Sequence, residues 1–83
     1  MAVLRFTEER ARWVAEEVWH PQQEGRRLED GSYELRIPYN NPRELVMDVL
    51  REGPNLIVIE PAELVDEVKS KLQETLGRYN KDS

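Results

Sequence analysis

Apolar and polar residues alternate in two stretches of the chain, as they do in half-buried β-strands. The first is Ala2–Phe6, and the second covers residues 33–39, where tyrosine, leucine and isoleucine alternate with charged residues and a proline. Between them, Gln22–Leu28 is polar and weakly patterned, which suits an edge strand. Asp30-Gly31 supplies the residues of a tight hairpin turn. A fourth stretch, Leu56–Ile59, is continuously apolar and predicts a short strand buried in large part on both faces.

Helical spacing separates these strands. Thr7 is suited to cap a first helix, whose apolar stripe has the i, i+3, i+4, i+7 spacing and which ends before Pro21. Asn41 caps a second helix, with Pro42 at its first position and Gly53-Pro54 after its end. The two predicted stripes are Ala11, Val14, Ala15 and Val18 in the first helix, and Leu45, Val46, Val49 and Leu50 in the second.

A last helix begins at Glu60-Pro61 and has an apolar residue at every fourth position. Its stripe consists of Leu64, Val68, Leu72 and Leu76, joined by Val65 and Tyr79. Three roles are open for this helix: it could cover the open face of the sheet, extend an edge of the sheet, or dock onto a partner.

The predicted order is strand, helix, strand, strand, helix, strand, helix. We therefore expect an α+β domain with the ferredoxin-like βαββαβ arrangement, a four-stranded antiparallel sheet and an additional C-terminal helix. Right-handed crossovers place the first and third strands in the centre of the sheet. A single domain over residues 2–79 is expected, with residues 80–83 as a disordered tail.

Composition narrows the class of protein. The chain has 83 residues, with 12 basic and 17 acidic side chains and a formal net charge of −5. This acidic balance argues against a non-specific nucleic-acid binder. Because cysteine is absent, there are no disulfides and no thiolate metal site, which favours the cytoplasm. The longest apolar run, Leu56–Ile59, is too short to span a bilayer, and we expect no membrane association.

The sequence favours a protein that is not an enzyme. His20 is the only histidine, and no serine lies in a Gly-x-Ser-x-Gly context. The four glycines are dispersed, so they form no phosphate-binding loop. The carboxylates lie mostly in first helical turns or on polar helix faces, without the spacing of metal ligands. We therefore expect no catalytic residue, no metal and no cofactor.

Two groups of residues are candidates for binding. A basic group on the predicted hairpin and first strand could hold an anionic ligand, although neighbouring glutamates could reduce it to a solvated, ion-paired surface. The arginines are Arg5, Arg26, Arg27 and Arg36, and the glutamates are Glu24, Glu29 and Glu34.

The second group is Trp13, Trp19 and His20, at the margin of the first helix, which either contact a partner or close the core. Phe6, Tyr33 and Tyr39 could stack RNA bases on the central strands, but core packing is favoured for them.

Several motifs also follow one another in a recognisable order. Val3-Leu4-Arg5-Phe6 precedes Trp19-His20-Pro21-Gln22-Gln23, and Asn41-Pro42-Arg43-Glu44-Leu45 precedes Gly53-Pro54 and Ile57-Val58-Ile59-Glu60-Pro61. Together they resemble the WCX domain, the C-terminal extension of bacterial WYL-domain transcriptional regulators, over residues 2–79. Gln22 stands where that family usually has serine.

The resemblance implies a ferredoxin-like domain that serves in dimer contacts and in signal sensing, while helix-turn-helix and WYL domains of the same chain bind DNA and ligand. Some members of the family sense single-stranded DNA or another nucleic-acid ligand. Neither a helix-turn-helix nor a Trp-Tyr-Leu triplet is present here, so we expect an excised C-terminal fragment with an added Met1. The expected role is regulation and self-association within a parent regulator. The alternative is a module that binds an anionic ligand or single-stranded nucleic acid through the arginines.

Overall fold

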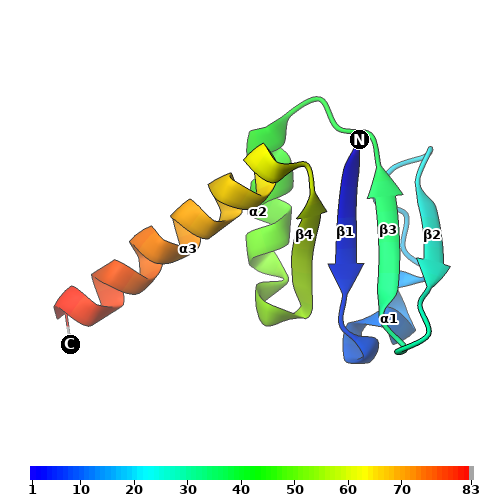
Figure 1. The fold of residues 1–83 in the computed structure, drawn as a ribbon, viewed down its shortest axis with the longest axis horizontal. Helices are drawn as coiled ribbons and strands as arrows, with labels where there is room; N and C mark the ends of the chain where they lie inside the picture. The colour runs from blue at the N-terminus through cyan, green and yellow to red at the C-terminus, as the bar shows by residue number, and fades with distance from the viewer. Residues whose placement is uncertain (83) are drawn as a thin grey trace.

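Four antiparallel strands form one sheet in the order β2-β3-β1-β4, and two helices lie against one of its faces (Figure 1). The computed structural model describes residues 1–82. The strands are β1 (Ala2–Phe6), β2 (Glu24–Arg27), β3 (Tyr33–Ile37) and β4 (Leu56–Glu60). The helices are α1 (Glu8–Val14), α2 (Pro42–Arg51) and α3 (Ala62–Asp82), with a short 3-10 turn at Gly53–Asn55. The expected ferredoxin-like arrangement is confirmed, with the first and third strands in the centre.

The core lies between the sheet and the helices. Phe6, Leu4 and Leu35 are fully buried on the inner face of the central strands. Val14 of α1 and Val49 of α2 complete this apolar layer from the helix side. Alternation along β1 and β3 therefore directs one set of side chains into the core and leaves the other set on the opposite, open face.

Both predicted N-caps are confirmed. The Thr7 hydroxyl accepts a hydrogen bond from the Arg10 backbone N–H at 3.3 Å. The Asn41 side chain accepts from the Arg43 and Glu44 backbone N–H groups at 3.1 and 3.3 Å. These bonds satisfy amides that have no partner within the helix, so they determine where α1 and α2 begin.

The edge strand β2 is exposed along its length. Gly31 has a φ of 90°, as expected for the turn before β3, but Asp30 does not have a positive φ, and residues 28–32 form a longer loop than the expected tight turn. Tyr33 of β3 lies over Gly25, where an added Cβ would come within 1.9 Å of the Tyr33 hydroxyl oxygen. The tyrosine ring thus covers the part of β2 that lacks a side chain.

The first helix is shorter than its spacing predicts. It ends at Val14, and Val18 is 78% exposed, so the expectation that the helix and its buried stripe continue to Val18 is wrong. The Gln23 side chain supplies the physical reason. Its oxygen accepts hydrogen bonds from the backbone N–H groups of Trp19 and His20, at 2.6 and 3.1 Å, and its nitrogen donates to the Glu17 carbonyl at 2.9 Å. These bonds satisfy the backbone of residues 17–20 in a loop, so no helix is needed there.

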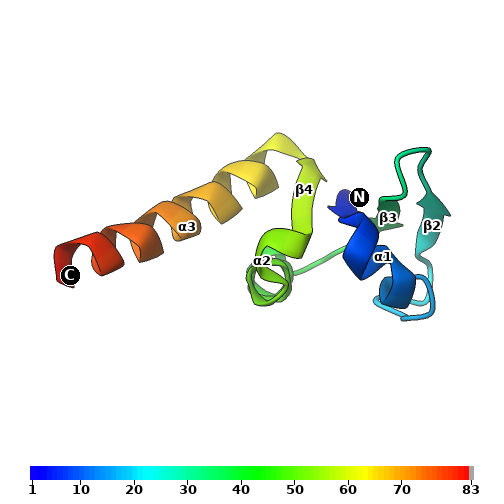
Figure 2. The same ribbon diagram turned by 90° about the horizontal axis from the view of Figure 1, so that it is seen from below.

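The open face of the sheet is not covered by α3. Leu64 and Val68, in the first turns of α3, pack into the core beside β4 and α2, and the helix then leaves the sheet edge (Figures 1 and 2). Ile57 of β4 is consequently 55% exposed. The expectation that β4 is buried on both faces is therefore wrong at Ile57. The helix continues through Asp82, beyond the point at which we expected a disordered tail, and Ser83 lies outside the described residues.

Candidate functional site

Three arginines surround one buried glutamate on the open face of the sheet. Arg5 of β1 and Arg26 of β2 are the cross-strand neighbours of Glu34 in β3. Arg26 Nε and Arg36 Nε lie 3.2 and 3.4 Å from Glu34 Oε2, and Arg5 Nη2 lies 3.7 Å from Oε1. We call these four residues the arginine cluster. It brings together three of the four arginines expected to form a basic patch.

The electrostatics of the arginine cluster leave an excess of positive charge. Glu34 is only 5% exposed, and burial opposes its ionisation. Hydrogen bonds from Arg36 and Arg26 outweigh this effect and lower the pKa of the Glu34 carboxyl below its ordinary value. One carboxylate faces three guanidinium groups, so these four residues alone have a formal excess of two positive charges, which Glu24, the cross-strand neighbour of Arg36, reduces.

The guanidinium groups of the arginine cluster remain open to a ligand. Their side chains are between 40% and 69% exposed, although Arg5 Nε itself is buried and has no hydrogen-bond partner within residues 1–82. A hollow of about 380 Å³ adjoins Arg26 and Arg36, with Glu24 and Gly25 at its border. Glu24 adds a negative charge beside the cluster. The three arginines are thus exposed, as expected for a basic patch, and they are also ion-paired with Glu34, as expected for an ion-paired surface.

Arg27 lies apart from the arginine cluster. It is opposite Tyr33 in the strand register, and Tyr33 packs against the core on the helix side of the sheet. Because side chains alternate along a strand, Arg27 belongs to the helix side as well. The sequence grouped Arg27 with the other arginines by proximity along the chain, but strand alternation separates them.

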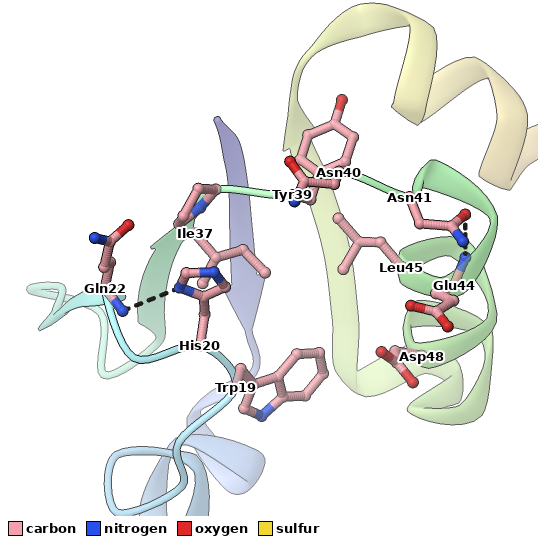
Figure 3. A pocket seen from close by; sticks show the side chains of 11 residues that line it. Trp19, His20, Gln22, Ile37, Tyr39, Asn40, Asn41, Glu44, Leu45 and Asp48 are labelled. Atoms are coloured by element: carbon pink, nitrogen blue, oxygen red, sulfur yellow. Dashed lines mark hydrogen bonds between the residues drawn. The ribbon is translucent and has the colours of Figure 1, made fainter.

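Trp19 forms the central wall of a groove between the loop after α1 and helix α2 (Figure 3). On one side it borders a pocket of about 400 Å³ with His20, Tyr39 and Asp48, and on the other a pocket of about 480 Å³ with Val18 and Asp48. Trp19 and Asp48 line both pockets, and we call this feature the Trp19 groove. Its other walls carry the carboxylates Glu17, Glu44 and Glu52 together with Arg51, whose Nη1 lies 3.2 Å from an Asp48 oxygen.

An arginine beneath the Trp19 groove connects its two sides. Arg10 Nε lies 2.6 Å from a Glu52 oxygen beyond the end of α2, and Arg10 Nη1 lies 2.8 Å from Glu17 in the loop after α1. These bonds raise the pKa of Arg10, and the Arg10 hydrogen bond lowers the pKa of Glu17. The Arg10 guanidinium also lies 5.7 Å from the centre of the Phe6 ring. This clamp was not apparent from the sequence, because its three residues are up to 42 positions apart.

The residues expected to contact a partner have different environments. Trp13 is 62% exposed. Trp19 is half-buried, and its indole N–H donates to Glu17 at 3.1 Å. His20 borders the pocket, and its Nδ1 accepts a hydrogen bond from the Gln22 backbone N–H at 3.0 Å (Figure 3). Of the three, Trp13 therefore presents the largest unoccupied surface.

A third surface lies on α3, where its apolar stripe extends past the core. Leu72, Leu76 and Tyr79 are 53%, 60% and 72% exposed, and we call them the α3 stripe. The sequence predicted the stripe but not the point at which the domain ceases to cover it. That point follows Val68, the last residue of the stripe that is buried.

Two further properties bear on function. Within residues 1–82, no group of three or more histidine, aspartate and glutamate side chains is placed to hold a metal ion. The helices described in this part of the chain are also not long and apolar enough to cross a membrane.

A comparison with known protein families connects the fold to a family. The family model of the WCX domain matches residues 1–76, which is most of the 83-residue chain. No curated protein matches the chain significantly. The match includes the loop with Trp19, the arginine cluster and the Arg10 clamp, and it ends at Leu76 within the α3 stripe. The chain belongs to the WCX domain family.

Proposed function

We propose that this chain is the regulatory C-terminal domain of a WYL-type bacterial transcriptional regulator, and that it contributes self-association and signal sensing. The match to the WCX family over residues 1–76 carries this proposal. Promoter binding is then the task of a helix-turn-helix domain elsewhere in the regulator, which acts in the cytoplasm. The net charge of −5 is consistent with a domain that does not itself bind the operator.

The surfaces of the domain support an interaction role. Its core is closed by α1, α2 and the first turns of α3, yet the α3 stripe stays uncovered. Exposed apolar residues that continue a buried stripe are typical of protein contact surfaces. The proposal therefore assigns self-association to the domain.

The proposal does not include catalysis. His20, the only histidine, uses Nδ1 to accept a backbone hydrogen bond that shapes its own loop. The buried carboxylate of Glu34 is ionised and held by arginines, which is unsuited to a general acid. Both groups are thus assigned to positioning the loop and the sheet.

Removal of the domain tests the sensing role. We expect the regulator without this segment to bind promoter DNA but to lose the change in DNA binding that its effector causes. The measurement is an electrophoretic mobility shift with and without effector, for the intact and the shortened regulator. An unchanged effector response in the shortened regulator would rule out a sensing role.

A second candidate function is anion binding by the arginine cluster. The excess positive charge of its three arginines over Glu34 and the adjoining hollow favour a phosphate-bearing ligand such as a short single-stranded oligonucleotide. A fluorescent oligonucleotide titrated at 50 and 200 mM salt should bind more tightly at the lower salt concentration. Arg36→Gln should weaken binding, whereas Arg12→Gln on α1 removes the same charge away from the cluster and should not. Absence of binding at 50 mM salt would reject this candidate.

A further inference from the structure

We propose that the α3 stripe pairs two copies of this chain as an antiparallel helix pair, centred between Thr75 and Leu76. This inference rests on the proposed self-association and specifies its surface, its partner and its orientation. Leu72, Leu76 and Tyr79 lie within roughly 60° of one another around a helix that turns 100° per residue. They therefore form one continuous strip, which we call the strip. It lies on the part of α3 that follows Val68, where the helix extends from the domain (Figure 2).

The strip is self-complementary about its centre. In an antiparallel pair, Leu72 of one copy is level with Tyr79 of the other, and the two Leu76 side chains approach each other. A two-fold contact requires this property, because the same patch must serve on both copies. The exposed residues Leu72, Thr75 and Tyr79 have the three-four spacing of helices that pack side by side, and Val65 and Val68 continue this spacing into the domain's own core.

Thr75 is the only polar side chain at the centre, and its hydroxyl already has a partner. Thr75 Oγ1 donates to the Lys71 carbonyl at 2.9 Å within α3. The threonine can therefore be buried with its methyl group toward the second copy, without leaving a hydrogen-bonding group unsatisfied. Thr75, which lies beside the strip, thus does not prevent pairing.

The charges beside the strip favour the antiparallel orientation. Lys69 and Lys71 lie on the two sides of Leu72. In a parallel pair, each of these lysines would lie at the same level along the axis as the same lysine of the other copy. The antiparallel pair separates the two Lys71 residues by about 13 Å along the axis, which exceeds the Debye length of about 8 Å at physiological salt, although it brings Arg78 of one copy within about 3 Å of the level of Lys71 of the other. Helix dipoles also oppose each other favourably in this orientation.

The shape of the domain accommodates the same orientation. The strip begins after Val68, where α3 leaves the core. In the antiparallel pair Asp82, the last described residue of α3, is level with residue 69 of the other copy. The two domain bodies then lie at opposite ends of the helix pair.

The size of the strip predicts a weak dimer. The strip exposes on the order of 400 Å² per copy, and the total of about 800 Å² is less than the roughly 1,200 Å² of a stable interface. We therefore expect a dissociation constant of about 0.1–1 mM for the 83-residue chain. Within a regulator, a second contact elsewhere would strengthen the same pairing.

Sedimentation equilibrium of the 83-residue chain between 10 µM and 1 mM tests this pairing. We expect a reversible monomer–dimer equilibrium, and Leu76→Glu should weaken association at least tenfold. Ser70→Glu adds the same charge on the opposite side of α3 and should leave it unchanged. Gly77→Ala, which lies outside the strip and has open space for a Cβ, should strengthen association by making α3 a more stable helix. Circular dichroism of each variant shows that the fold is retained.

The distance between two spin labels tests the orientation of the helix pair. The chain contains no cysteine, so Asp66→Cys allows one spin label per copy. Antiparallel pairing predicts a label separation of about 30 Å along the helix axis, and parallel pairing a much shorter one.

A monomer throughout the concentration range, equal effects of Leu76→Glu and Ser70→Glu, or only a short label distance would overturn the inference. Self-association that survives Leu76→Glu would overturn this surface alone and leave the proposed self-association in place.

Discussion

The indole ring of Trp19 packs edge-on against the ring of Phe6, with ring centroids 5.4 Å apart and an interplanar angle of 77°. Phe6 is fully buried at the end of β1, whereas Trp19 lies in the loop that follows the short helix α1. The loop residue thus covers the core at a place where a longer α1 would otherwise do so. This contact links the core of the domain to the Trp19 groove.

Replacement of Trp19 should reveal how much the domain depends on this contact. We expect Trp19→Ala to lower the free energy of unfolding by about 2–3 kcal/mol, because it removes a half-buried ring and its edge-on contact. Trp13→Ala removes the same side chain from an exposed position and should change stability by less than about 0.5 kcal/mol. Urea unfolding of both variants measures the difference. Equal destabilisation would show that the two tryptophans have equivalent packing roles.

The Arg10 clamp should be sensitive to a change that preserves charge. Arg10 bonds Glu17 and Glu52 through a planar group, and lysine cannot bridge two carboxylates in the same geometry. Arg10→Lys should therefore destabilise the domain by about 1–2 kcal/mol. Arg12→Lys, on the exposed side of the same helix, is the control and should have no measurable effect. Chemical unfolding that fails to distinguish the two variants would contradict the clamp.

The arginine cluster should depend on the charge of Glu34. Glu34→Gln keeps the shape of the side chain but removes the carboxylate charge that three arginines contact, so we expect a loss of stability. The loss should be only about 1–2 kcal/mol, because the arginines are partly solvated. If the cluster binds anions, the same substitution should tighten oligonucleotide binding. Unfolding and binding measured on one protein preparation separate the two effects. Unchanged stability would mean that solvent screens the cluster completely.

The contribution of Glu34 should also depend on pH. Its folded pKa lies below the ordinary value of 4.5, so folding favours the ionised form. This stabilisation is fully present above the ordinary pKa and is lost as the pH falls through the folded pKa. The difference in unfolding free energy between the wild type and Glu34→Gln should therefore be largest near pH 7 and decrease below pH 4. A difference that stays constant to pH 3 would contradict the charge-based explanation.

Much of this architecture could be predicted from the sequence. Alternation in β1 and β3, the caps Thr7 and Asn41, and the turn at Gly31 all reflect local physical chemistry, and each is present in the structure. The order of the elements then leaves few topologies, which is why the sheet order was correct.

The errors arose where a distant or side-chain contact overrides a local pattern. Helical spacing at residues 11–18 suggested a longer α1, but Gln23 satisfies the loop backbone and Trp19 supplies the packing. The patch of four arginines ignored the alternation that turns Arg27 to the other side of the sheet. The periodicity of α3 showed which residues share a face, but not how far the domain covers that face.

The central claim is that this domain contributes to the self-association of its regulator. Sedimentation equilibrium of the regulator with and without this segment tests the claim most directly. We predict that removing the segment raises the dimer dissociation constant at least tenfold, or about 1.4 kcal/mol. An identical dissociation constant for the intact and the shortened regulator would contradict the claim.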